Sequence, residues 1–125
     1  MAKENTGSPL VVKFMKMSCF TASFYGAATL IAPWSLAGKY MYPAAEVATE
    51  ESFDAFRYLM AAALLGWANG KYQAIQNGPV GCVRFCKTNV IPMLIMVGSS
   101  ARAGAWDTPI WAAFTAAYVY FGYVA

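Results

Sequence analysis

The residues that could carry chemistry in this chain are few. The sequence contains no histidine, which removes the commonest general base, metal ligand and haem ligand. Its three cysteines are an odd number and include no Cys-X-X-Cys pair, which argues against a disulfide framework or a zinc site. Cys82 and Cys86 are spaced to share a helix face, and we expect these thiols and Cys19 to serve packing. We therefore expect no catalytic residue and no metal site.

Arg57 is the charged residue that falls inside a predicted apolar segment. A charge at membrane depth is costly and prompts a functional hypothesis. Asp54 lies three residues earlier on the same helix face, and Glu51 is close by. Arg57 is also near the helix end, where a long side chain can reach the interface. We interpret it as a paired, structural arginine; the alternative is contact with a lipid phosphate or a carboxylate of a partner.

Four side-chain amides form a second candidate group. They are Asn69, Gln73, Gln76 and Asn89, which lie near predicted helix ends. The magnesium of chlorophyll accepts an oxygen or nitrogen ligand, and without histidine these amides are what the chain offers. The alternative role is ordinary hydrogen bonding at helix ends. The amides are therefore candidate pigment ligands, with chlorophyll and carotenoid as the candidate cofactors.

The elements that must position these residues are predicted by hydropathy and charge. Of 125 residues, 59% are apolar and 12% charged, well below the roughly 25% charged residues of an average soluble domain. Four apolar stretches alternate with gaps whose basic content also alternates, as expected when basic loops stay on the side from which a membrane protein inserts. One predicted side holds Lys3, Lys13, Lys16, Lys71, Arg84 and Lys87, and the other holds Lys39 and Arg102.

This pattern predicts an all-α integral membrane protein with a bundle of about four transmembrane helices. We expect a polar N-terminal tail over residues 1–12 and a single domain over residues 13–125. No cleavable signal peptide is evident at the start. Basic and aromatic residues do not alternate along a polar surface, so we expect no nucleic-acid partner.

Local signals set the expected helix ends. The first helix is expected from Lys13 to about Ala32 and the second over residues 52–73, with Lys71 counted in the basic loop that follows. The third segment has a short apolar core, and we expect it to kink at Pro92 or to be partly re-entrant. A fourth helix is expected from Thr108, as an N-cap followed by proline.

Small residues recur at four-residue spacing on two predicted helices. They are Ser18, Ala22 and Gly26 on the first, and Ala62, Gly66 and Gly70 on the second. This spacing allows helices to approach closely in lipid. The contact is either internal packing or docking onto a lipid or partner helix, and the sequence leaves both open.

We therefore expect a non-catalytic accessory subunit of a large energy-converting membrane complex. The aromatic content of 16% and the amides favour a photosynthetic complex in the thylakoid over a mitochondrial one. The expected partners are other membrane subunits and lipids. The alternatives are an accessory subunit of a respiratory complex or ATP synthase, and a free-standing protein that binds a lipid or quinone near Arg57. The early arginine followed by Leu65-Gly66-Trp67-Ala68 resembles DoxX-like four-helix membrane proteins.

Overall fold

The fold is described from a computed structural model, which defines residues 9–33, 50–104 and 106–124. All secondary structure in these residues is helical, which confirms the expected all-α class. The elements are α1 (Pro9–Ile31), α3 (Glu50–Gln76), α4 (Gly78–Thr88), α5 (Val90–Ala103), α6 (Thr108–Val119) and η3, a π-helical turn (Tyr120–Val124). The helix expected from Lys13 begins four residues earlier, at Pro9, and the helix expected over 52–73 continues to Gln76.

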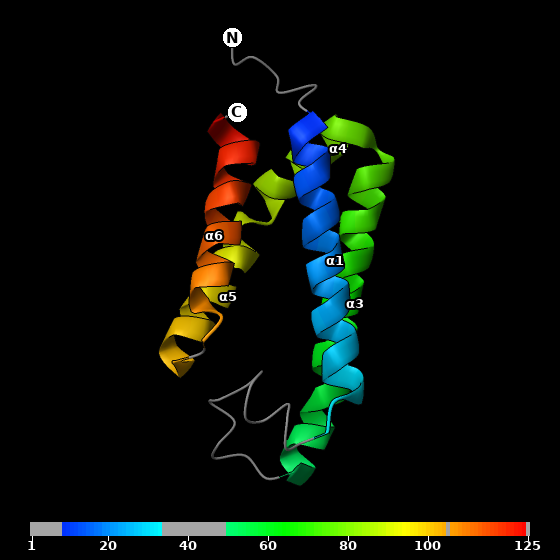
Figure 1. Cartoon of the computed structure of the whole chain (residues 1–125), viewed down its shortest axis with the longest axis vertical. Helices are drawn as coiled ribbons and strands as arrows, with labels where there is room; N and C mark the ends of the chain where they lie inside the picture. The colour runs from blue at the N-terminus through cyan, green and yellow to red at the C-terminus, as the bar shows by residue number, and fades with distance from the viewer. Residues whose placement is uncertain (1–8, 34–49, 105, 125) are drawn as a thin grey trace.

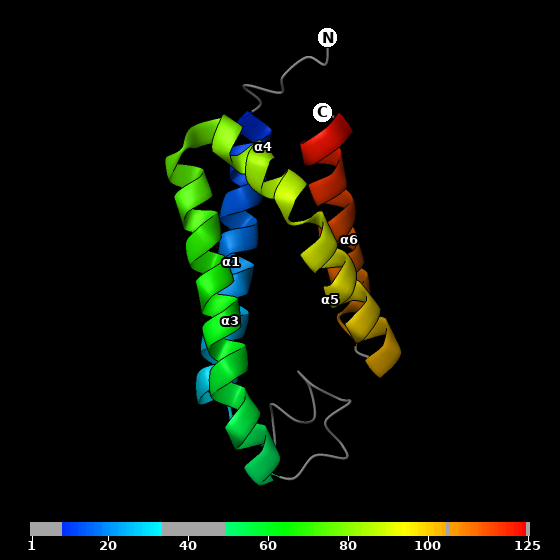
Figure 2. The same cartoon turned by 180° about the vertical axis from the view of Figure 1, so that it is seen from behind.

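Two helical hairpins meet at one end of the molecule (Figure 1). Helices α1 and α3 pack along each other as the longer hairpin, and α5 packs against α6 as the shorter one. Helix α4 lies between the hairpins and contacts all four of these helices and η3 (Figure 2). The start of α1, helix α4 and the end of η3 therefore share one end, as the basic loops predicted.

The third apolar segment is broken at Asn89, three residues before Pro92, where the expected kink would fall. Helices α4 and α5 meet there at 51°. The Asn89 side chain donates to the carbonyl of Phe85 at 2.9 Å and to the hydroxyl of Thr88 at 3.1 Å, which stabilises the break. Pro92 lies in the first turn of α5, where the backbone N–H that proline lacks would have no partner within the helix. The proline cannot donate to the carbonyl of Thr88 and its ring crowds that carbonyl, so it favours the break at Asn89.

The fourth helix starts almost where the sequence predicts. Asp107, not Thr108, occupies the N-cap position of α6, and Pro109 follows directly after Thr108, the first residue of the helix. The acidic residue at this N-cap faces the positive end of the helix dipole.

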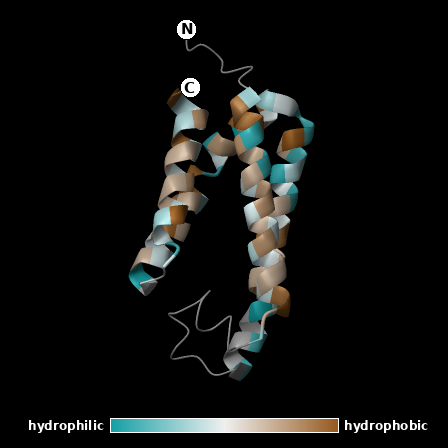
Figure 3. Cartoon of the chain, in the orientation of Figure 1, coloured by the Kyte–Doolittle hydropathy of each residue, from teal (hydrophilic) through white to brown (hydrophobic). Residues whose placement is uncertain are grey.

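The main hydrophobic cluster lies where α1, α4, α5, α6 and η3 converge. The ring of Phe14 lies at its centre, with ring centroids 5.6 Å from Tyr118 and 5.2 Å from Phe121. Cys82 and Cys86 are fully buried in this cluster as free thiols, which agrees with the expected packing role. Apolar residues also cover much of the surface of both hairpins (Figure 3).

In the part of the chain that is described, no helix taken singly combines the length and the hydropathy needed to cross a membrane. The bent pair of residues 78–88 and 90–102 reaches that threshold when the two helices are taken together.

Candidate functional site

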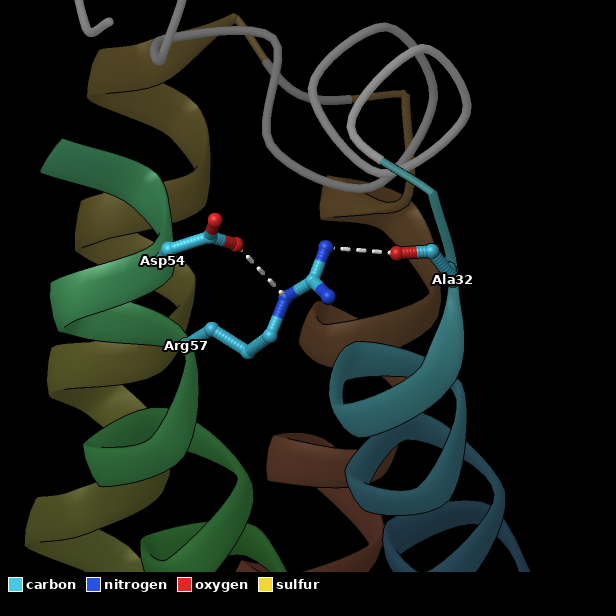
Figure 4. A network of polar contacts seen from close by, with 3 residues as sticks. All are labelled: Ala32, Asp54 and Arg57. Carbon is cyan, nitrogen blue, oxygen red and sulfur yellow. Dashed lines mark hydrogen bonds and ion pairs between the residues drawn. The ribbon is translucent and has the colours of Figure 1, made fainter. Parts of the chain in front are cut away.

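Arg57 fastens the end of α1 to α3. Its Nη2 donates to the carbonyl of Ala32 at 2.6 Å, and its Nε lies 3.7 Å from Oδ1 of Asp54 (Figure 4). The carbonyl belongs to the residue directly after α1, where helices leave carbonyl groups without helical partners. The arginine side chain is 14% exposed and the aspartate 55%. These contacts agree with the paired, structural interpretation and leave contact with a lipid phosphate or partner as a prediction.

Lys71 is buried, although the charge pattern predicted it in a basic loop. The structure corrects that placement, because α3 continues to Gln76 and the lysine is only 2% exposed. Its Nζ donates to the carbonyl of Ser18 at 3.3 Å and lies 4.2 Å from the ring centroid of Trp67. Among the described residues no carboxylate pairs with it. The carbonyl dipole and the aromatic face therefore offset the cost of burying the ammonium.

The lysine belongs to a polar cluster between α1, α3 and α6. Ser18 and Tyr118 share a hydrogen bond of 3.1 Å, and Lys71 also lies 5.9 Å from the tyrosine ring centroid. The thiol of Cys19 lies 3.3 Å from the carbonyl of Ala68. The described residues include no group of three histidine, cysteine or acidic side chains placed to hold a metal ion. We interpret the cluster as a polar link that fixes α1 and α3 against α6.

Asp107 forms a second polar link toward the other end of the bundle. It is 4% exposed, and its Oδ2 accepts hydrogen bonds from Trp111 Nε1 at 2.9 Å and from the Tyr25 hydroxyl at 3.3 Å. The rings of Tyr25 and Trp111 also pack with centroids 5.3 Å apart. Its Oδ1 is buried and has no hydrogen-bond donor among the described residues. This aspartate joins α1 to the start of α6, a role that its position in a polar gap of the sequence did not indicate.

The four candidate amides separate into two environments. Asn69, Gln73 and Gln76 are exposed on one face of α3, since their spacing of four and three residues follows the helical period. Asn89 instead accepts a hydrogen bond from Trp67 Nε1 at 3.1 Å, in addition to its two donated bonds. Three of the amides are therefore accessible to an external ligand, and the fourth, Asn89, forms hydrogen bonds at the break between α4 and α5.

The small residues of α1 pack within the chain. Ser18, Ala22 and Gly26 are buried on the side of α1 that contacts α3. A methyl group at position 26 would lie 2.8 Å from Cγ and Cδ2 of Leu65, so the absence of a side chain allows the close approach. The corresponding residues of α3 behave differently, because Gly66 is exposed with no atom within 4 Å of the equivalent methyl position. Contact of the α1 face with a lipid or partner is not needed to explain its composition.

Two cavities lie on the surface of the bundle. One, of about 440 Å³, is an apolar groove between α1 and α6 lined by Phe14, Met17, Pro109, Ile110, Ala113, Phe114 and Ala117. The other, of about 520 Å³, lies between the end of α3 and α4 and is lined by Gly70, Ala74, Asn77, Val80, Gly81, Arg84, Phe85 and Thr88. Neither cavity is lined by Arg57. A pocket beside that residue was expected if the protein binds a lipid or quinone. The second cavity combines a cation with apolar walls, a property that no sequence motif indicated.

Comparisons with protein-family models, with curated proteins and with solved structures find no match to this chain. They add no support to the likeness to DoxX-like proteins.

Proposed function

We propose that the chain is a multi-pass membrane protein that serves as a non-catalytic accessory subunit of a large membrane complex. The observation that carries this proposal is the distribution of polarity. Many large apolar side chains are exposed on the outside, while several polar side chains lie inside. That distribution suits a bundle surrounded by lipid and other subunits better than one surrounded by water.

Both hairpins carry exposed apolar side chains. On α1, Phe20 is 72% exposed and Phe24 is also exposed, and on α5 the exposed side chains include Ile91, Leu94 and Ile95. The α5 residues are spaced by three and four positions, so they form one continuous outward face. In water such faces would be an aggregation hazard, whereas in a membrane complex lipid or a neighbouring helix covers them.

Buried polar residues contribute to the moderate hydropathy of the long helices, together with exposed ones such as Lys16 and Asn69. At a rise of 1.5 Å per residue, α1 and α3 measure about 34 and about 40 Å, against about 30 Å for a hydrocarbon core. Their length is therefore sufficient, and their average hydropathy is what falls short. Ser18, Thr29 and Lys71 lower that average but are buried inside the bundle. Side chains buried inside the bundle do not contact the surrounding lipid, so their polarity does not affect the contact between lipid and helix.

We further propose that the complex is a photosynthetic one in the thylakoid. The support is the exposed face of α3, where Asn69, Gln73 and Gln76 lie beside the half-exposed ring of Tyr72. An amide oxygen there could ligate a chlorophyll magnesium while the aromatic ring packs on the pigment.

Comigration after gentle extraction tests the proposal. The native membranes are first washed with alkaline carbonate, then solubilised in digitonin, and the particles are separated by size with absorption spectra and mass spectrometry of each fraction. We expect the chain to resist the wash and to migrate with a pigmented particle of several hundred kilodaltons. Comigration with a colourless large particle would replace the photosynthetic assignment by a respiratory or ATP-synthase one. Migration as a small species would refute the accessory-subunit proposal, and release by the wash would refute membrane integration.

A further inference from the structure

The cavity between α3 and α4 presents one positive charge with no internal partner. Arg84 lines it from α4, is exposed, and forms no ion pair with any carboxylate in the described ranges. Helix α4 contains no acidic residue. Lys87 on the same helix is directed elsewhere, since its Nζ lies 5.8 Å from the ring centroid of Tyr123 in η3. The cavity therefore offers a single cationic group for an anion.

The surroundings of Arg84 favour an anion further. The cavity includes the start of α4, where backbone N–H groups point outward and the helix dipole is positive. The Asn77 side chain forms no capping hydrogen bond to these groups, and its Nδ2 donates to the carbonyl of Gln73 at 2.9 Å. The cavity also belongs to the basic end of the molecule, which includes Lys13 and Lys16 in the first half of α1.

Apart from the polar residues Asn77 and Thr88, the remaining walls of the cavity are mainly apolar. They are formed by Val80 and Phe85 of α4 and by Gly70 and Ala74 of α3. Four residues before Gly70 on the same face of α3 lies Gly66, which has no side chain and no neighbour within 4 Å of its methyl position. An open strip without side chains therefore leaves the cavity along α3 at Gly70 and Gly66, away from the basic end.

We propose that this cavity binds one anionic phospholipid, with its phosphate at Arg84 and an acyl chain against Phe85, Gly70 and Gly66. The inference rests on the proposed membrane location. A phospholipid joins an anion to a hydrocarbon chain in one molecule, which is the combination that the cavity presents, and its headgroup lies at the basic end of the bundle. A free phosphate would satisfy the arginine but would leave the apolar walls uncovered.

Lipid retention measured on the full chain tests the inference. The protein is reconstituted in vesicles of phosphatidylcholine with a minority of phosphatidylglycerol, extracted in mild detergent and analysed by native mass spectrometry. We expect the wild type to retain phosphatidylglycerol preferentially. Arg84→Gln should reduce that preference about tenfold, the effect of losing one hydrogen bond to a charged group. The matched control, Lys87→Gln, removes a charge of the same helix outside the cavity and should keep the preference within about twofold.

A second variant tests the proposed contact between the cavity and an acyl chain. Gly70→Leu should fill the cavity and reduce retention of both lipids, because even its Cβ would lie 3.3 Å from Phe85 Cε2. Circular dichroism of each variant checks that the helices remain folded. Equal retention in the wild type and Arg84→Gln, displacement by millimolar inorganic phosphate alone, or occupation of the cavity by a helix of another protein in cross-linking would each overturn this inference. Failure of the wild type to float with the vesicles would overturn the membrane location as well.

Discussion

Adding one methyl group at Gly26 should destabilise the α1–α3 contact, whereas the same change at Gly66 should not. The methyl group at position 26 would lie 2.8 Å from two carbons of Leu65 and 3.3 Å from Cβ of Leu64. The preferred separation of such carbons is about 3.5–4.0 Å, so either the Leu65 side chain or α1 itself must shift. At position 66 no atom lies within 4 Å, although the glycine occupies the same kind of helical site.

The two substitutions share one favourable effect, which allows the packing cost to be isolated. Replacing glycine by alanine inside a helix gains about 1 kcal/mol from helix propensity. Overpacking a close contact costs about 1–3 kcal/mol. We therefore expect Gly66→Ala to stabilise the chain by about 1 kcal/mol. Gly26→Ala should range from neutral to about 2 kcal/mol destabilising once the propensity gain is subtracted.

The free energy of unfolding of both variants is measured in one mild detergent, by titration with SDS and far-UV circular dichroism. The difference between the two variants cancels the propensity gain and reports the packing cost at position 26. Stability changes of equal size at the two positions would refute the argument that the buried face of α1 requires glycine there. Since the spacing of small residues alone predicts a similar cost at both positions, the comparison also separates the structural argument from the sequence pattern.

Five further substitutions, at four residues, test the polar links of the bundle by the same unfolding assay. Arg57→Gln should cost about 1–3 kcal/mol through loss of the charged hydrogen bond to the end of α1, while Asp54→Asn should cost under about 1 kcal/mol because that ion pair is half exposed; equal losses would contradict this ranking. Lys71→Met should leave stability unchanged or raise it, whereas Lys71→Ala should lose about 2–4 kcal/mol by opening a cavity; a large loss in the methionine variant would show that the ammonium itself stabilises the fold. Asp107→Ala should cost about 1–3 kcal/mol and alter the near-UV spectrum of Trp111, whose indole N–H loses its acceptor; an unchanged spectrum would contradict the observed hydrogen bond.

Much of the fold could be predicted from local sequence. The predicted helix ends agree with the structure within a few residues at most positions. The signals that mark them act over single helical turns: Pro33 just after α1, the acids Glu51 and Asp54 at the start of α3, and the Thr108-Pro109 pair at the start of α6. The kink in the third segment was expected from Pro92, and the break occurs at Asn89, three residues earlier. Its position also depends on the hydrogen bonds of Asn89 with Phe85 and Trp67, and the partner on α3 is remote in sequence.

The candidate site was predictable only in part, since the same residue type has different roles in different environments. The pairing of Arg57 with Asp54 could be predicted from their spacing. The hydrogen bond from Arg57 to Ala32 joins two helices, and no local sequence pattern indicates it. The exposed amides of α3 follow from helical periodicity, whereas the engagement of Asn89 does not.

The sequence by itself determined that the described chain is helical, where most helices begin and that basic residues gather at one end. These properties depend on side-chain size, backbone propensity and charge within a few residues. Only the tertiary structure decided that Lys71 is buried against Ser18 and Trp67, that Asp107 joins α1 to α6, and that Arg84 lines an apolar cavity. Each of these depends on which helix faces lie against one another. That arrangement follows from the packing of the whole bundle and not from any local pattern.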